Sequence, residues 1–323
     1  MLSKKEKYLT EKWWWTYLSF SNIIGNDNVK NILTKSLKNN TILHSYMFIG
    51  ETGIGKKMMA NQFAKMILCN NFNGEECNTC KSCVEFDSGN NPDYVYIEPE
   101  GRNIKIEQIR EMQIKVVEKP INSGKKIYII NDADLMTKEA QNCLLKTLEE
   151  PPEYIVIILI VNNENKMLTT IRSRCMKIHF DKIKDDEVKR FLKEKCNIDN
   201  VNNSLLKMCD GSIGKCLSIS NKLEDYGELE RIFSNLNTSL TSVINSAELL
   251  YKNKDNINDY LDYINVILYI KSKENNNYLK YVNCIKIVEN TKKRLLSNSN
   301  YDMCIDYLLF NIWEEINEKN SRS

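Results

Sequence analysis

The chain has no long hydrophobic run, little net charge and only two histidines, and each shortage limits the functions that are expected. Its longest apolar run, YIVIILIV at 154–161, is far shorter than the roughly 20 residues that a membrane-spanning helix needs. The 45 basic and 43 acidic side chains leave a net charge of +2, so no global attraction to nucleic acid or membrane is expected. His44 and His179 lie at the edges of predicted strands, and we interpret both as structural.

The N-terminal segment lacks the features of a secretion signal. Residues 1–20 are basic, but they contain no sustained apolar stretch and no small-residue cleavage site. We therefore expect a cytoplasmic protein. The three tryptophans at 13–15 are interpreted as part of a poorly ordered extension, with a partner-docking patch as the alternative.

At 323 residues the whole chain is long enough for two or three modest cores. Strand and helix patterns alternate over its first half. Predicted strands lie at 44–50, 93–99, 125–134, 154–163 and 175–180, and predicted helices at 57–69, 104–119 and 137–150. Continuous apolar strands that alternate with helices are typical of a parallel α/β sheet. After residue 180 only helical patterns follow, first in a small module that ends near 220 and then in a C-terminal domain.

A degenerate phosphate-binding loop follows the first predicted strand. The stretch GETGIGKK, which begins at Gly50, nearly matches G-x-x-x-x-G-K-[ST], with Gly55 and Lys56 in register. Gly50, Gly53 and Gly55 permit a ring of backbone N–H donors for phosphate. The last position holds Lys57, and an ammonium has no lone pair with which to bind Mg²⁺ as a hydroxyl would. The loop therefore lacks one part of a working nucleotide site.

Four of the eleven cysteines are bunched and predict a structural metal centre. Cys69, Cys77, Cys80 and Cys83 have the spacing C-x7-C-x2-C-x2-C, which suits a closed tetrahedral Zn²⁺ site. Four unligated thiols or a redox pair remain as alternatives. The other seven are interpreted as small buried apolar residues: Cys143, Cys175, Cys196, Cys209, Cys216, Cys284 and Cys304.

Several segments together resemble the clamp-loader branch of the AAA+ ATPases. They are HSYMFIGETGIGKK (44–57), the four-cysteine insert (69–83), NDADLMTKEAQNCLLKTLEEPP (131–152), TTIRSRC (169–175), GSIGKCL (211–217) and SNSNYDMCIDYLLFNI (297–312). The resemblance implies an α/β P-loop NTPase (AAA+) domain with a parallel sheet over 21–180. It also implies a small helical lid domain at 181–220 and an all-α collar, or oligomerisation, domain at 221–323.

The same resemblance implies partners and a process. It places the chain in a five-subunit ring of the bacterial DNA polymerase III holoenzyme, built with the delta subunit and the ATP-hydrolysing tau/gamma subunits. The chain would be a non-catalytic subunit of this DNA-directed DNA polymerase in DNA replication. Through the ring it would act on the sliding clamp and primed DNA.

The resemblance also assigns chemistry to individual residues around the loop. Active relatives carry an Asp that organises Mg²⁺ and then a Glu that activates water, where this chain has Asn131 and Asp132. Together with Lys57, these departures imply that the chain has no ATPase of its own and that Mg²⁺ does not bind. ATP or ADP can still occupy the loop unhydrolysed, or the loop can be empty and kept for packing. The first sensor position falls at Asn162 or Asn163.

The resemblance implies that one functional residue of the family, an arginine finger, is retained in this chain at Arg174. In Ser173-Arg174-Cys175 it matches the family's arginine finger, which acts in trans on the neighbouring subunit's ATP. Arg172 is interpreted as structural. Lys215 falls at the second sensor position, where active relatives usually have arginine.

Two other functions remain open from the sequence. One is an active AAA+ ATPase of the tau/gamma type, in which Lys57 and Asn131 are tolerated. The other is a zinc-dependent nucleic-acid-binding module that reads through the cysteine cluster. The insert EECNTCKSCVEFD at 75–87 is more acidic than basic, which disfavours phosphate contact.

Overall fold

A computed structural model gives the structure of the protein and divides the chain into two compact units. It describes residues 20, 23–196, 198, 201–220, 222–234, 236, 239–274, 278–297 and 299–317. The first unit comprises Met1–Glu187 with Ser212–Gly214, and the second comprises Val188–Gly211 with Lys215–Ser323. The expected N-terminal extension, with its tryptophans at 13–15, lies outside the described residues up to residue 19.

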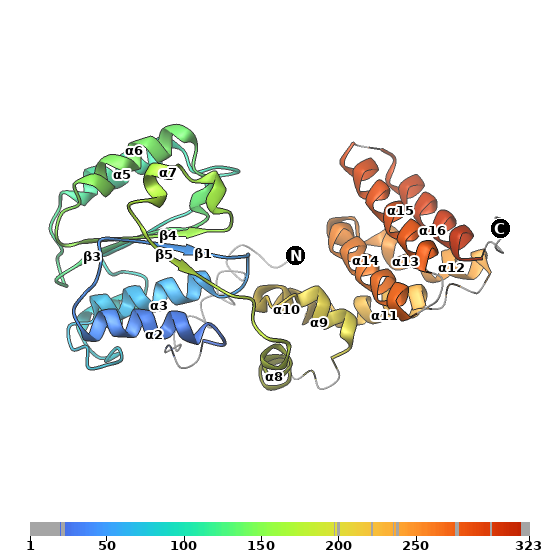
Figure 1. Ribbon diagram of the computed structural model, residues 1–323, viewed down its shortest axis with the longest axis horizontal. Helices are drawn as coiled ribbons and strands as arrows, with labels where there is room; N and C mark the ends of the chain where they lie inside the picture. The colour runs from blue at the N-terminus through green and yellow to red at the C-terminus, as the bar shows by residue number, and fades with distance from the viewer. Residues whose placement is uncertain are drawn as a thin grey trace. The chain divides into compact units, whose positions relative to one another are not determined.

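A five-stranded parallel sheet forms the centre of the first unit (Figure 1). Its strands are β1 (Ser45–Ile49), β2 (Tyr94–Ile97), β3 (Lys126–Ile130), β4 (Ile155–Val161) and β5 (Met176–His179), in the order β2-β3-β4-β1-β5. The three inner strands are buried along their whole length, whereas the edge strand β5 buries only Ile178. Burial on both faces explains the continuous apolar runs of the inner strands. All five strands lie where the sequence predicts them.

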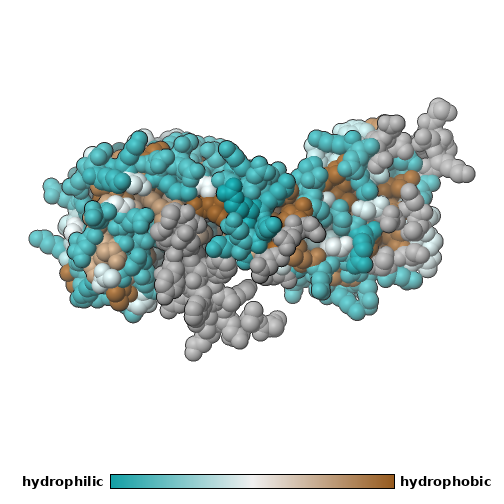
Figure 2. Space-filling view, turned by 90° about the horizontal axis from the view of Figure 1, so that it is seen from below, coloured by the Kyte–Doolittle hydropathy of each residue, from teal (hydrophilic) through white to brown (hydrophobic). Residues whose placement is uncertain are grey.

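Helices cover both faces of this sheet (Figure 1). One face carries α5 (Ile106–Val116), α6 (Lys138–Glu149) and α7 (Thr169–Arg172), and the other carries α2 (Asp27–Lys38) and α3 (Lys56–Leu68). Thr137 caps the predicted helix α6, since its side chain accepts the N–H of Ala140 at 3.2 Å. In the view of Figure 2, the described surface of this unit is mostly hydrophilic, with smaller hydrophobic areas. The buried apolar residues of this unit form two cores, one on each face of the sheet.

The cysteine insert contains a helix that the sequence analysis did not predict. α4 (Lys81–Asp87) follows the loop after α3 and leads back to β2. Two short 3₁₀ turns, η2 (Ala133–Leu135) and η3 (Glu164–Lys166), follow β3 and β4. These turns and the loop before α3 lie at the carboxyl ends of the parallel strands, where such sheets usually bind ligands.

The regular structure described in the second unit is entirely helical. After α8 (Asp185–Cys196), which begins at its boundary, come α9 (Asn203–Cys209), α10 (Ile213–Ser220), α11 (Leu223–Ser234), α12 (Leu240–Ser246), α13 (Glu248–Lys252), η4 (Lys254–Asn256), α14 (Ile257–Glu274), α15 (Tyr278–Leu296) and α16 (Tyr301–Asn317). The Tyr263 hydroxyl donates to Glu230 at 2.6 Å, and Glu230 also accepts from Ser204 at 3.0 Å. These bonds join α9, α11 and α14 in one unit. The finer division into a lid at 181–220 and a collar at 221–323 stays a prediction.

The two units confirm the predicted fold class, a P-loop α/β domain with a parallel sheet followed by an all-helical region. Among the helices that the structure describes, none is both long and apolar enough to cross a membrane.

Candidate functional site

The loop between β1 and α3 has the strand, glycine loop and helix order expected of a phosphate-binding loop. Gly53 and Gly55 have φ values of +82° and +94°, a region that glycine adopts without the steric cost of a Cβ atom. A Cβ on Gly53 would also lie only 2.3 Å from Ser212 Oγ. Conformation and space therefore both require glycine at position 53.

The loop lysine is bonded to its own protein. Lys56 is 4% exposed, and its ammonium donates to the carbonyl oxygens of Gly50 at 2.7 Å and Glu51 at 2.6 Å and to Asn162 Oδ1 at 3.0 Å. These three acceptors match the three donors of an ammonium. Burial lowers the pKa of Lys56 to about 8, although nearby carboxylates, Asp132 first, act to raise it.

The ends of β3 and β4 supply a polar network beside this lysine. Asp132 accepts from the side-chain amides of Asn131 at 2.9 Å and Asn162 at 2.8 Å. Asp134, which the sequence analysis did not single out, accepts the backbone N–H of Asn162 at 3.0 Å. The second acidic residue of NDAD was the available signal. The structure thus brings Lys56, Asn131 and Asp132 together through Asn162, and their role at a bound phosphate stays a prediction.

Only one of the two candidate sensor asparagines faces the loop. Besides Lys56, Thr52 Oγ1 donates to Asn162 Oδ1 at 3.2 Å. The Asn163 side chain instead caps η3 by accepting the N–H of Asn165 at 3.0 Å. The geometry therefore favours Asn162 for any contact with a bound phosphate.

Lys57 points toward a different part of the sheet. It lies in the first turn of α3, half-buried, with its ammonium 4.7 Å from the ring centroid of Tyr96 on β2. This cation–π contact is favourable. The residue that replaces the Mg²⁺-binding hydroxyl is thus used in a contact between α3 and β2.

A segment from far along the chain lies against the loop. The N–H of Gly214 donates to the Gly53 carbonyl at 3.0 Å, and Ser212 Oγ donates to the Thr52 carbonyl at 3.1 Å. Residues 212–214 belong to the first unit. This segment lies in the predicted lid, and its contact with the loop was not predicted from the sequence, although its small residues were a signal for close approach. Lys215 follows in α10, exposed in the second unit, and its sensor role stays a prediction.

Arg174 lies between α7 and β5 with a partly exposed guanidinium. Nη2 is 2.9 Å from Glu149 Oε1, and Nη1 donates to the Thr170 carbonyl at 2.9 Å. Ser45 Oγ donates to the Arg174 carbonyl at 2.7 Å, which fixes the backbone to the start of β1. The neighbouring Arg172 is half-buried at the end of α7. The structure therefore holds the backbone at Arg174 firmly and its side chain by surface contacts.

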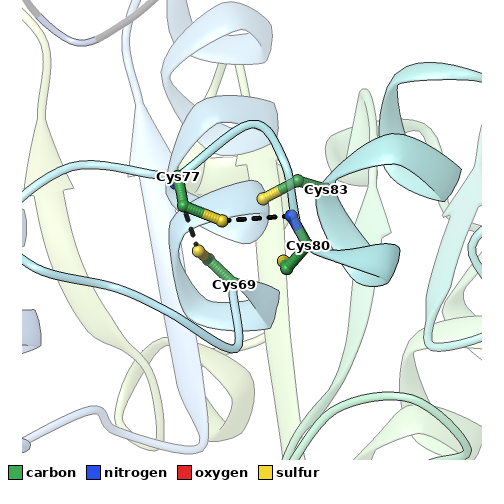
Figure 3. Close-up of side chains that lie close together, drawn as sticks. All are labelled: Cys69, Cys77, Cys80 and Cys83. Carbon is green, nitrogen blue, oxygen red and sulfur yellow. Dashed lines mark hydrogen bonds between the residues drawn. The ribbon is translucent and has the colours of Figure 1, made fainter.

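The four bunched cysteines converge on one point (Figure 3). Their sulfur atoms all lie within 4.8 Å of one another, so they can hold a metal ion. The N–H of Cys77 donates to Cys69 Sγ and the N–H of Cys80 to Cys77 Sγ, each at 3.3 Å. Backbone N–H groups, that of Thr79 first, lower the pKa of Cys77 to about 6, whereas burial raises the pKa of Cys69 and Cys83. A thiolate is the form that binds metal.

The remaining residues noted in the sequence are the two histidines and the seven scattered cysteines. His44 and His179 are exposed, one before β1 and one at the end of β5. Of the seven scattered cysteines, five are buried, as expected for small apolar residues, and Cys143 and Cys196 are half-buried.

The relatives named below are all subunits of DNA polymerase III. A family model described as DNA polymerase III, delta subunit, matches residues 25–184. The gamma/tau subunit of Mycoplasma pneumoniae is 34% identical over 219 residues, which are 66% of this chain and 32% of the relative. The delta' subunit of Bacillus subtilis is 38% identical over 152 residues, 47% of this chain and 46% of the relative. The tau subunit of Escherichia coli is 28% identical over 221 residues, 66% of this chain and 34% of the relative.

Among solved structures, a DNA polymerase III gamma subunit-related protein from Thermotoga maritima matches with a TM-score of 0.45 and 18% identity, over 88% of this chain and 99% of that one. The chain spans only 32%, 36% and 40% of the length of three gamma/tau relatives. The family-model match and the named relatives agree with the resemblance seen in the sequence. The chain belongs to the clamp-loader family of DNA polymerase III subunits.

Proposed function

We propose that the chain is a delta prime-type subunit of the DNA polymerase III clamp loader and that it does not hydrolyse ATP itself. It would occupy one place in a five-subunit ring with the delta and tau/gamma subunits. In the cytoplasm this ring would load the sliding clamp onto primed DNA during replication. Within it, this chain would donate Arg174 to a neighbouring subunit's ATP site.

The bonding of Lys56 carries the first half of this proposal. Its three donors are used by Gly50, Glu51 and Asn162, so a phosphate could bind only after these bonds break. At the position of the Mg²⁺ ligand, Lys57 is a cation held over Tyr96. Both observations favour a loop that has a structural role in place of a hydrolytic one.

The metal-organising position supports the same conclusion. The Asn131 side-chain NH₂ donates to Asp132 Oδ2 at 2.9 Å, and the neutral amide supplies no charge for a cation. Asp132 accepts a second amide from Asn162 at 2.8 Å. Mg²⁺ is usually held by carboxylates together with the substrate phosphates, and here the one carboxylate at these two positions is already hydrogen-bonded.

The surroundings of Arg174 suit a finger that acts in trans. Its pair with Glu149 joins side chains that are 36% and 49% exposed, and surface pairs of this kind contribute about 0–1 kcal/mol. A finger contributes roughly 10³–10⁵ in rate, which equals about 4–7 kcal/mol. Leaving Glu149 would thus cost little compared with the gain at a neighbour's nucleotide.

Reconstitution tests the finger. The chain is assembled with delta and tau/gamma subunits, and the DNA-stimulated ATPase is measured for the wild type, Arg174→Ala and Glu149→Ala. We expect Arg174→Ala to lower the ATPase severalfold without changing ring assembly, and Glu149→Ala to retain it. Arg190→Ala, at an exposed arginine of α8, is the matched control. An unchanged ATPase in Arg174→Ala rings would rule out the finger.

An active ATPase of the tau/gamma type is the second candidate, because relatives with that name match 66–73% of this chain. Mg²⁺-dependent ATP turnover by the purified chain, abolished by Lys56→Ala, would establish it. A nucleic-acid module has no comparable support. The ammonium of Lys65, beside the insert, is buried and lies 2.7 Å from Asp87, so this lysine is not placed to contact a phosphate of a nucleic acid.

We also propose that the four cysteines bind a structural Zn²⁺. Four converging sulfurs with no open position suit a closed structural site, in which Zn–S bonds of about 2.3 Å place the sulfurs about 3.8 Å apart. Elemental analysis should find one zinc per chain in the wild type and much less in Cys80→Ser. A wild-type chain purified without chelators and free of zinc would contradict this part of the proposal.

A further inference from the structure

A fully buried carboxylate organises the loop behind the cysteine insert. Asp93, which directly precedes β2, is 0% exposed. Its Oδ1 accepts the backbone N–H of Ile121 at 2.7 Å, and its Oδ2 accepts those of Asn122 at 2.7 Å and Ser123 at 2.9 Å. A buried carboxylate is tolerated when it is hydrogen-bonded in this way. The three bonds fix the conformation of residues 121–123.

The Ser123 hydroxyl then joins two separate segments of the chain. It donates to the Leu68 carbonyl at 2.9 Å, and its oxygen lies 3.0 Å from Ser82 Oγ. Because a hydroxyl has a single hydrogen, Ser82 must be the donor in the second contact. Asn91 Nδ2 donates to both Oγ and the carbonyl of Ser82, each at 2.9 Å. The donor and the acceptor of each of these hydrogen bonds are therefore defined.

These two segments carry two of the four metal-binding sulfurs. Leu68 directly precedes Cys69 at the end of α3, and Ser82 directly precedes Cys83 in α4. Ser82 is itself 0% exposed. A displacement of either segment would move a sulfur. The hydroxyl of Ser123, which contacts both segments, can therefore influence the distance between the sulfurs of Cys69 and Cys83.

Lys65 holds the remaining part of the insert. Its ammonium, 5% exposed, donates to Asn78 Oδ1 at 2.6 Å and lies 2.7 Å from an oxygen of Asp87. Asn78 follows Cys77, and Asp87 ends α4. Both attachments run from the α/β domain to the insert through protein groups alone. They can therefore form before any metal binds.

We propose that Ser123 is a positioning residue for the metal centre. Its hydroxyl holds the segments that bear Cys69 and Cys83 at the separation that the metal requires, and Asp93 holds Ser123 in place. The cluster is thereby preorganised, which reduces the ordering that accompanies metal binding. This role rests on the proposed zinc site and is independent of the clamp-loader proposal.

The test measures metal binding by the full-length chain. Zinc affinity is determined by competition with a chromogenic chelator, the absorption spectrum of the Co²⁺-substituted protein reports ligand geometry, and unfolding of the metal-free protein reports stability. We expect Ser123→Ala to bind zinc about tenfold more weakly, the lower end of the effect of losing an outer hydrogen bond at a metal site, with a changed Co²⁺ spectrum. Ser123→Thr, which keeps the hydroxyl, should restore both.

Ser88→Ala is the matched control, because this exposed serine directly follows α4 and its described side-chain bonds are local, with Oγ donating to the Glu85 carbonyl at 3.0 Å and accepting from Asn90. It should bind zinc as the wild type does. Ser82→Ala breaks the second arm of the Ser123 bridge and should also weaken binding, which keeps the test decisive if Ser123→Ala does not fold. If both Ser123→Ala and Ser82→Ala show the zinc affinity and Co²⁺ spectrum of the wild type, the role of Ser123 is overturned, whatever the stability of these two variants. A wild-type chain that binds no zinc would refute the metal centre itself, and this role with it.

Discussion

Replacing Lys56 with methionine should destabilise the first unit, with no nucleotide-dependent effect. Methionine keeps most of the apolar stem and removes the ammonium. The carbonyls of Gly50 and Glu51 and the side-chain oxygen of Asn162 then lose the donor that now lies 2.6–3.0 Å away. In a working phosphate-binding loop the same change acts chiefly on the bound nucleotide.

The magnitude follows from these three acceptors. A buried acceptor without a partner costs about 1–3 kcal/mol. Water can reach the exposed Glu51, and removing a buried ammonium regains part of its desolvation cost. We therefore expect a net loss of about 2–4 kcal/mol in the free energy of unfolding. For a unit of this size that lowers Tm by roughly 4–15 °C.

Differential scanning calorimetry with and without Mg²⁺-ATP is the assay. Lys57→Met is the matched control, since the neighbouring lysine contacts Tyr96 through a cation–π interaction and should lose only about 1 kcal/mol. A nucleotide that binds the folded state raises Tm by mass action. A structural role for Lys56 would be refuted if Mg²⁺-ATP raised the Tm of the wild type by several degrees and Lys56→Met lost this gain with an unchanged ligand-free Tm.

The pH dependence of stability gives an independent check on the same lysine. Burial lowers its pKa in the folded protein from 10.5 to about 8. Between these values the unfolded chain binds the proton more fully, so the stability contributed by this group rises with pH across the window. The difference in Tm between the wild type and Lys56→Met should therefore widen from pH 8 to pH 10.

Two further changes test other parts of the first unit. Gly53→Ala should destabilise it by about 2 kcal/mol through its positive φ and should speed amide hydrogen exchange at Gly214, because the new Cβ would lie 2.3 Å from Ser212 Oγ; unchanged exchange would mean that residues 212–214 do not depend on this contact. Removing the proposed Zn²⁺ with a strong chelator should lower Tm and increase hydrogen exchange at 77–83, while the sheet strands stay protected; loss of protection throughout the sheet would show that the metal supports the whole domain.

The sheet could be predicted from the sequence, because each inner strand is buried on both faces and therefore appears as a continuous apolar run. α6 could be predicted equally well, since Thr137 and Pro151 mark its two ends locally. α4 was missed because seven residues inside a cysteine-rich insert give too short a pattern for helical periodicity. Local signals were sufficient only where an element is long or clearly bounded.

The bonding of the loop could not be predicted in the same way. The pattern G-x-x-x-x-G-K requires a lysine, but it does not say whether the ammonium meets phosphate or the loop's own carbonyls. The choice depends on Asn162, which is 106 residues away, and on a fold that brings β4 beside β1. The contact of Ser212 with the Thr52 carbonyl spans 160 residues and is equally invisible to local patterns.

These contacts also change the weight that each motif carries in the functional proposal. Lys56 and Gly53 are explained by the chain's own stability, because one is bonded to three acceptors and the other touches residues 212–214. A preserved glycine–lysine pattern is therefore weak support for nucleotide hydrolysis. Arg174 differs, since its partly exposed pair with Glu149 contributes at most about 1 kcal/mol to the fold. Stability accounts poorly for an arginine at this position, and the proposed role at a neighbour's nucleotide accounts for it better. The arginine is thus the more informative of the two motifs.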